Sequence, residues 1–201
     1  MKKTLQLFLW IAFAIVVIGA LIYSLGGSNS GEEVQASQSD PTPVTILKYS
    51  DYQCPACKMY IPLQQQLKAD FGDLVTIEYR HFPLRGHQYA QLAAQAAEAA
   101  RVQGRYREMH DRIFEGQEVW SRGNAESIFI EYAGELGLDQ DQFEEDLHSE
   151  EVVQIVNRQQ AEGERRMVQA TPTFFINGQM IRQTPQSYEQ FKSLVEMFVY
   201  Q

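Results

Sequence analysis

Ser50-Asp-Tyr-Gln-Cys-Pro-Ala-Cys57 decides the fold, because it holds two cysteines, Cys54 and Cys57, between two apolar patterns of different period. Val44 to Tyr49, just before it, is a short β-rich run that predicts a buried strand. Lys58 to Asp70, just after it, repeats apolar residues every four positions and predicts a helix. The cysteines should therefore lie at the end of a strand and in the first turn of a helix.

The segment Leu74 to Tyr79 predicts the next strand. A strand–helix–strand unit of this kind should have parallel strands and a right-handed crossover. Pro62, inside the predicted helix, should kink it.

A long helical section follows. Its predicted helices cover residues 88–101, 105–114, 125–136, about 140–147 and 151–166. Asp139 and Gln142 have the spacing of a capping box for the fourth of them. The section is too large for a crossover connection, so we expect a helical subdomain inserted at approximately 86–168.

The chain then returns to strand. Thr173–Ile176 and Met180–Arg182 flank Asn177-Gly178, which is a strong signal for a hairpin turn. Ser187 and Gln190 have the spacing to cap a last helix. The whole order predicts a small mixed α/β sheet covered on both faces by helices.

The N-terminus carries a membrane signal. Lys2 and Lys3 precede an apolar stretch over residues 7–25, close to the roughly 20 residues that span a bilayer. We expect residues 1–6 in the cytoplasm and 7–25 as a transmembrane signal-anchor, with the rest outside. A cleaved signal peptide is the alternative.

Residues 26–43 are rich in Gly, Ser, Asn, Gln, Glu and Pro, which is typical of a flexible linker. The folded domain is then 44–201, in an oxidising compartment where a thiol pair can persist as a disulfide.

Composition excludes several classes of protein. The 201 residues include 17 basic and 26 acidic side chains, a net charge of -9, which argues against nucleic acid as a partner. The two cysteines rule out a disulfide-scaffolded miniprotein and a four-cysteine zinc site.

The Cys-x-x-Cys motif carries the chemistry. The free N–H groups and positive end of a helix favour a thiolate there, and Pro55 fits the first helical position. We expect Cys54, the exposed member, to form a mixed disulfide that Cys57 resolves, with Pro55 and Ala56 tuning the pair. A structural disulfide or half of a metal site is the alternative, although a bridge closing so short a loop stabilises little.

Four motifs together resemble the DsbA-like thiol–disulfide oxidoreductases of the thioredoxin superfamily. They are Ser50–Cys57, Tyr79-Arg-His-Phe-Pro-Leu84, the alanine-rich helix after His87, and Thr171-Pro-Thr-Phe-Phe-Ile-Asn-Gly178. The resemblance covers about residue 44 to the end and is closest to the membrane-anchored, BdbD-like bacterial members. It implies a thioredoxin-like fold with an inserted helical subdomain.

The resemblance also implies roles for Thr171 and Pro172. The family's proline at this position is cis and packs beside the active-site cysteines, and Thr171 would present backbone groups to an extended substrate segment. An ordinary strand-initiating proline is the alternative.

Lys48 departs from the pattern, because thioredoxin-like proteins commonly carry a buried acid six residues before the first cysteine. If Lys48 is charged and points inward, it should stabilise a thiolate and make the pair more oxidising. If the side chain reaches outward to solvent, it has no such effect.

Other candidates have weaker signals. Asp51 and Tyr52 should shape the loop before the cysteines, and Tyr60, Phe82 and Phe174 are candidates for an apolar rim that meets unfolded substrate. The four histidines are not spaced as a ligand set, and we expect neither a metal nor a cofactor.

The expected protein is a membrane-tethered monomer that introduces disulfide bonds into reduced or unfolded exported proteins, reoxidised by a quinone-linked membrane thiol oxidase. A disulfide reductase or isomerase is the nearest alternative. A copper-binding protein that uses both thiols is an alternative from a different class.

Overall fold

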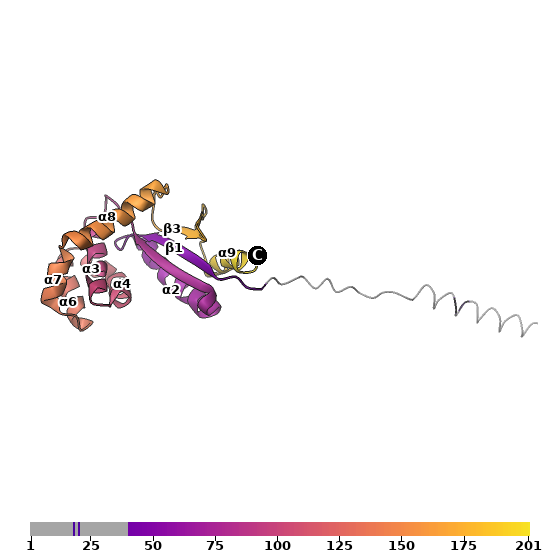
Figure 1. The fold of residues 1–201 in the computed structure, drawn as a ribbon, viewed down its shortest axis with the longest axis horizontal. Coiled ribbons are helices and arrows are strands. Elements are labelled where there is room, and N and C mark those ends of the chain that lie inside the picture. The colour runs from indigo at the N-terminus through magenta and orange to yellow at the C-terminus, as the bar shows by residue number, and fades with distance from the viewer. Residues whose placement is uncertain (1–17, 19, 21–39) are drawn as a thin grey trace, which may run out of the picture. The chain divides into compact units, whose positions relative to one another are not determined.

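The computed structural model describes residues 18, 20 and 40–201 of the chain (Figure 1). Residues 40–201 lie in one compact unit. Among the described residues no helix is long and apolar enough to cross a bilayer. The predicted cytoplasmic segment 1–6 and most of the anchor 7–25 and of the linker 26–43 lie outside the described residues.

The sheet has four strands in the order β2-β1-β3-β4. β1 (Val44–Ser50) pairs in parallel with β2 (Val75–His81), and antiparallel with β3 (Thr173–Ile176). β4 (Gln179–Met180) completes the hairpin with β3, and both residues of the connecting Asn177-Gly178 turn have positive φ, as that turn requires. The predicted mixed sheet is confirmed.

Helix α2 (Pro55–Phe71) follows β1 and leads through a 3-10 turn, η1 (Gly72–Leu74), into β2. It begins three residues before the predicted start at Lys58, because Pro55 occupies the first helical position, where its missing N–H costs nothing. The helix continues through Pro62.

The helical section contains six helices among the described residues. They are α3 (Ala90–Val102), α4 (Tyr106–Glu115), α5 (Gln117–Trp120), α6 (Ala125–Glu135), α7 (Gln140–Leu147) and α8 (Glu150–Arg165). Asp139 accepts a hydrogen bond from the Gln142 N–H, which confirms the predicted cap of α7. Figure 1 shows α3, α4, α6 and α7 gathered at one end of the domain, with α8 running from them toward the sheet.

The last helix, α9 (Tyr188–Val199), begins at the predicted Ser187 cap. Near its end, the Val199 carbonyl accepts a hydrogen bond from the N–H of Thr42, so the last residues of the predicted linker contact the domain.

The buried apolar residues form three clusters. One lies between the sheet, α2 and α9, and a smaller one contains Tyr49 and Phe82. The third fills the helical section and includes Cys54, Cys57 and eight alanines, six of them in α3. Small alanine side chains let neighbouring helices approach α3 closely. The active-site motif is therefore part of the packed core of the helical section rather than of a free loop.

Candidate active site

Cys54 is the N-cap residue of α2, and Cys57 lies in its first turn. Both are free thiols, and both are buried: Cys54 is 7% exposed and Cys57 is 0% exposed. Cys54 was expected to be exposed, and this was wrong. Its Sγ lies 3.4 Å from the carbonyl oxygen of Thr171, which covers it. Cys54 is still the more accessible thiol of the two.

The two thiols differ in acidity. A hydrogen bond from Cys57, supported by Thr171 and by the N–H groups of Cys57 and Ala56, lowers the pKa of the Cys54 thiol to about 5. Burial, followed by the hydrogen bond with Cys54, raises the pKa of the Cys57 thiol well above its ordinary value. At neutral pH the pair therefore holds one thiolate, on Cys54, and one proton, on Cys57.

Thr171 and Pro172 lie beside the pair, as the family resemblance implies, and the peptide bond between them is cis. They come directly before β3, the strand that pairs with β1. The Thr171 hydroxyl oxygen is buried and has no hydrogen-bond partner within residues 40–201. It is thus an available donor next to the Cys54 sulfur.

Lys48 is fully buried and points inward, so the alternative of an outward-reaching side chain is wrong. Its Nζ donates hydrogen bonds to the Cys57 carbonyl at 3.0 Å and to Oε1 of Gln64 at 3.2 Å, and lies 5.3 Å from the Phe114 ring centre. Burial lowers the pKa of Lys48 to about 8, although the charge interactions with both cysteines raise it. The lysine therefore retains most of its charge at neutral pH beneath Cys57.

Asp51 shapes the loop before the cysteines, as expected. Its carboxylate accepts hydrogen bonds from the N–H groups of Gln53 (2.7 Å) and Leu84 (2.9 Å), and its Oδ2 lies 2.7 Å from Nδ1 of His87. His87 lies in the loop before α3. These contacts join the active-site loop to the chain beyond β2.

Gln117 of α5 was missed by the sequence analysis. It is buried, and its Nε2 donates to the carbonyls of Tyr52 at 2.6 Å and of Cys54 at 3.1 Å. Its contacts are 63 and 65 residues away along the chain, and no local motif marks them. The helical section thus fixes the backbone of the reactive cysteine.

The other histidines are structural in this arrangement. His81 and Glu98 lie 2.7 Å apart in the interior, and burial lowers the pKa of His110 to about 4 although Asp111 contacts it at 2.8 Å. His148 is the C-cap of α7. Across the described residues, no three His, Cys, Asp or Glu side chains are grouped to hold a metal ion.

The predicted apolar rim was wrong. Tyr60, Phe82 and Phe174 are buried in the cores beside the sheet, because α2, α8 and α9 cover them. Apolar surface near Cys54 is found instead between α2 and the pair α4 and α5.

Comparisons with known proteins agree with this architecture. A family model described as thioredoxin matches residues 39–197. The curated relatives include Na(+)/H(+) antiporter NhaA 1 of Mycolicibacterium gilvum, 37% identical over 145 residues, which cover 70% of this chain and 22% of that protein. Na(+)/H(+) antiporter NhaA 3 of Salinispora tropica is 37% identical over 137 residues, 68% of this chain and 20% of that protein. The chain thus spans about a fifth of the length of these relatives.

Solved structures are similar over most of the chain. A thioredoxin-like oxidoreductase from Silicibacter pomeroyi has a TM-score of 0.64 and 28% identity, covering 79% of this chain and 87% of that one. BdbD from Bacillus subtilis has a TM-score of 0.69 and 23% identity over 79% and 89% of the two chains. Alpha-DsbA1 from Wolbachia pipientis has a TM-score of 0.67 and 17% identity over 79% and 86%. Because their sequence identities are low, the comparisons with BdbD and alpha-DsbA1 show a shared fold and nothing more.

Proposed function

Because the chain belongs to the thioredoxin family and shares its fold with BdbD and alpha-DsbA1, we propose that it is a DsbA-like thiol–disulfide oxidoreductase that introduces disulfide bonds into exported proteins outside the cytoplasmic membrane. The observation that carries the proposal is the unequal acidity of the two thiols, with the pKa of Cys54 lowered to about 5 and that of Cys57 raised. A stabilised thiolate favours the dithiol over the disulfide, so the oxidised pair gives up its disulfide readily.

The reaction proceeds in two exchanges. A substrate thiolate attacks the Cys54 sulfur of the oxidised pair, the Cys54–Cys57 bond breaks, and the Cys57 sulfur leaves and takes up a proton. A second substrate thiolate then attacks the substrate sulfur of the mixed disulfide, and Cys54 leaves as a thiolate. The substrate loses two electrons and gains a disulfide, and the protein keeps both electrons as its dithiol.

The neighbouring residues have supporting roles in this proposal. Thr171 and Pro172 hold an extended substrate segment against the Cys54 sulfur, which is supported by the 3.4 Å contact between that sulfur and the Thr171 carbonyl. Lys48 tunes the pair from beneath Cys57, and Pro55 and Ala56 set the geometry of the helix start.

Each turnover leaves the dithiol, so the cycle needs an oxidant. We assign this to a quinone-linked membrane thiol oxidase, and we propose that residues 7–25 anchor the chain, as a monomer, at the same membrane. The lysines before that segment and its apolar composition support this orientation. The ion transport named for the curated relatives is not part of the proposal, because the match spans about a fifth of their length.

The proposal is tested with the oxidised full-length chain and a reduced, unfolded protein that needs one disulfide to regain activity. We expect one substrate disulfide per chain, and none from Cys54→Ser. Reduced Cys57→Ala should instead accumulate as a mixed disulfide with disulfide-bonded substrate. If the wild-type chain reduces insulin but leaves the reduced substrate unfolded, the protein is a reductase and the oxidase proposal is wrong.

A further inference from the structure

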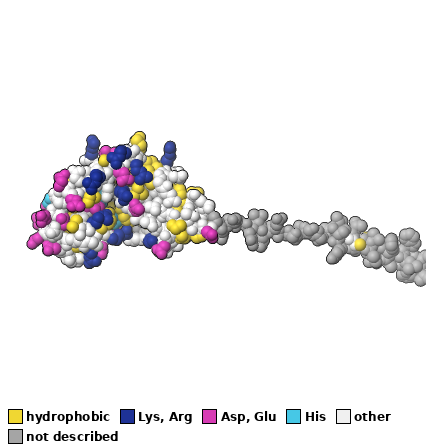
Figure 2. All heavy atoms as spheres, viewed as in Figure 1, with side chains coloured by type: hydrophobic (Ala, Val, Ile, Leu, Met, Phe, Trp, Pro, Cys, Tyr) yellow, Lys and Arg dark blue, Asp and Glu magenta, His cyan; other side chains and the backbone are white. Residues whose placement is uncertain are grey.

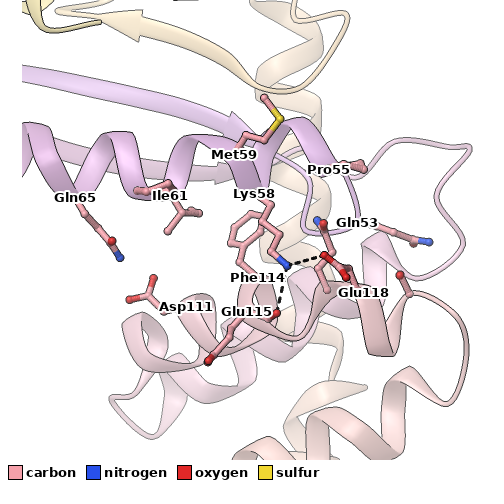
Figure 3. Close-up of a pocket in the computed structure, with 13 residues that line it drawn as sticks. Gln53, Pro55, Lys58, Met59, Ile61, Gln65, Asp111, Phe114, Glu115 and Glu118 are labelled. Atoms are coloured by element: carbon pink, nitrogen blue, oxygen red, sulfur yellow. Dashed lines mark hydrogen bonds and ion pairs between the residues drawn. The ribbon is translucent and has the colours of Figure 1, made fainter. Parts of the chain in front are cut away.

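A groove of about 750 Å³ lies between α2 and the pair α4 and α5, next to the reactive cysteine (Figure 3). Gln53 and Pro55, the residues on either side of Cys54, both line it. Thr171, which contacts the Cys54 sulfur, is not among the described residues that line the groove. Cys54 thus contacts Thr171 through its sulfur, and its two chain neighbours line the groove.

The walls of the groove are largely apolar. Ile61 of α2 and Phe114 of α4 lie on opposite walls (Figure 3), and Pro62 also lines the groove. Met59 of α2, with 67% of its surface exposed, lies at the border. An exposed methionine beside an apolar hollow favours binding of varied apolar side chains, because its side chain adapts its shape. The wall formed by α5 is fixed to the active site, since Gln117 binds the Cys54 carbonyl.

The rim of the groove is acidic. Asp111, Glu115 and Glu118 line it together with Lys58, whose Nζ lies 3.6 Å from Glu118 Oε1 and donates to the Glu115 carbonyl at 3.3 Å (Figure 3). Arg107 and Arg112 pair with two of these carboxylates at 3.1 and 4.0 Å, but neither arginine is among the lining residues. The Glu115 and Glu118 side chains are highly exposed despite these pairs, so an incoming cation can reach them.

We propose that this groove binds the segment of an extended, reduced substrate protein that adjoins its reacting cysteine, and that it favours an apolar residue next to a Lys or Arg. The proposal rests on the oxidoreductase function proposed above. The two chain neighbours of Cys54 line the groove and so place the segment beside the thiol, the apolar walls take the apolar side chain, and the acidic rim takes the basic one. A second copy of this chain is a poor occupant, because its net charge of -9 repels the rim.

The test measures how fast single-cysteine peptides attack the disulfide of the oxidised full-length chain. The peptides carry Leu-Lys, Leu-Glu or Gly-Gly beside the cysteine, on either side of it. We expect the Leu-Lys peptide to react about threefold or more faster than the Leu-Glu peptide at low salt, and this ratio to shrink as salt is added. Gly-Gly should be slower than Leu-Lys at every salt concentration.

Glu118→Lys should bring the Leu-Lys to Leu-Glu ratio to about one or below. The matched control is Glu144→Lys, which makes the same charge change on an exposed residue of α7. Figure 2 shows acidic side chains gathered at the end of the domain where Figure 1 places α6 and α7. Glu144→Lys should leave the ratio as in the wild type. Equal ratios in the wild type and Glu118→Lys, or the same loss in both variants, would overturn the groove proposal.

Oxidation of dithiothreitol by the same samples separates the two proposals, because this small dithiol reports on the cysteine pair without filling the groove. Wild type and Glu118→Lys should oxidise it equally. If the two proteins oxidise dithiothreitol equally and also have the same Leu-Lys to Leu-Glu ratio, the groove proposal fails and the oxidoreductase function stands. If the oxidised pair reacts with neither the peptides nor dithiothreitol, the function proposed above fails.

Discussion

The Thr171 hydroxyl is the side-chain group whose removal tests the acidity of Cys54 most simply. It is buried, has no other partner within residues 40–201, and lowers the pKa of the Cys54 thiol through its contact with the sulfur. Thr171→Val keeps the shape and removes the donor, so we expect the pKa of Cys54 to rise by about one unit, the worth of one hydrogen bond. Thiolate absorbance against pH in the reduced protein measures it.

Thr173→Val is the matched control, because the Thr173 hydroxyl donates to the Ala170 carbonyl and not toward the thiol. It should leave the pKa of Cys54 unchanged. An equal pKa in wild type and Thr171→Val would mean that the hydroxyl does not reach the thiolate.

Lys48→Met tests the buried cation. A unit charge about 6 Å from a thiolate contributes at most about 3 kcal/mol at an effective dielectric near 20. Because the charge favours the dithiol form, its removal should lower the reduction potential by up to about 60 mV. The difference should fade above pH 8, where Lys48 itself loses its proton. We would measure both potentials in glutathione buffers between pH 6 and 9.

Lys68→Met serves as the control for Lys48→Met, since Lys68 lies far along α2 with its side chain exposed. Its potential should match that of the wild type. If Lys48→Met also matches the wild type, the lysine has a packing role only.

The site residues that the sequence did not predict are those that act through partners far away along the chain. Cys54, Cys57 and Thr171-Pro172 were found because motifs mark them. Gln117 and Gln64 were not, because each acts through a contact that only the folded chain creates. The direction of Lys48 was likewise undecidable from spacing, since a lysine in a strand can reach water or a buried carbonyl.

At the scale of elements, short sequence patterns predicted most of the order of strands and helices along the chain. The strand–helix–strand unit, the Asn177-Gly178 hairpin and the caps at Asp139 and Ser187 were all found from short patterns. Helix α5 was missed as a separate helix because four residues carry no period. The rim residues Tyr60, Phe82 and Phe174 were misassigned because burial depends on which helices cover them.

The packing of α8 on the sheet gives a prediction at this scale. A Cβ on Gly163 would lie 2.6 Å from a Phe82 ring carbon and 3.0 Å from a Tyr49 ring carbon. Alanine favours a helix interior by about 1 kcal/mol over glycine, but overpacking a buried contact costs about 1–3 kcal/mol. We therefore expect Gly163→Ala to lower the free energy of unfolding, measured by urea denaturation.

Gly134→Ala in α6 is the matched control. Its new Cβ would meet only the end of the flexible Gln140 side chain, so the helix preference should prevail and stability should rise slightly or stay the same. A Gly163→Ala variant as stable as Gly134→Ala would show that α8 can shift away from the sheet at little cost.

For the whole molecule, the acidity of Cys54 couples folding to redox state. The folded pKa is about 5 and the ordinary value is 9.0, so between these values the unfolded reduced chain binds more protons than the folded one. The stability of the reduced protein should therefore rise with pH in this window, relative to the oxidised protein, by at most about 1.4 kcal/mol per pH unit. Below pH 5 the contribution is lost.

Urea denaturation of both redox forms between pH 5 and 7.5 measures this difference. The lowered pKa of His110 acts in both forms and cancels, and Lys48 titrates above this window. A difference between the two forms that does not change with pH would contradict a folded Cys54 thiolate.

The reduction potential of the Cys54–Cys57 pair tests the central claim most directly. The full-length chain is equilibrated in glutathione buffers, and free thiols are counted by mass after alkylation. A stabilised Cys54 thiolate predicts a potential well above that of the glutathione pool, at the oxidising end of the thioredoxin superfamily near -120 mV. A potential near the roughly -270 mV of thioredoxin would contradict the account and make the protein a reductase.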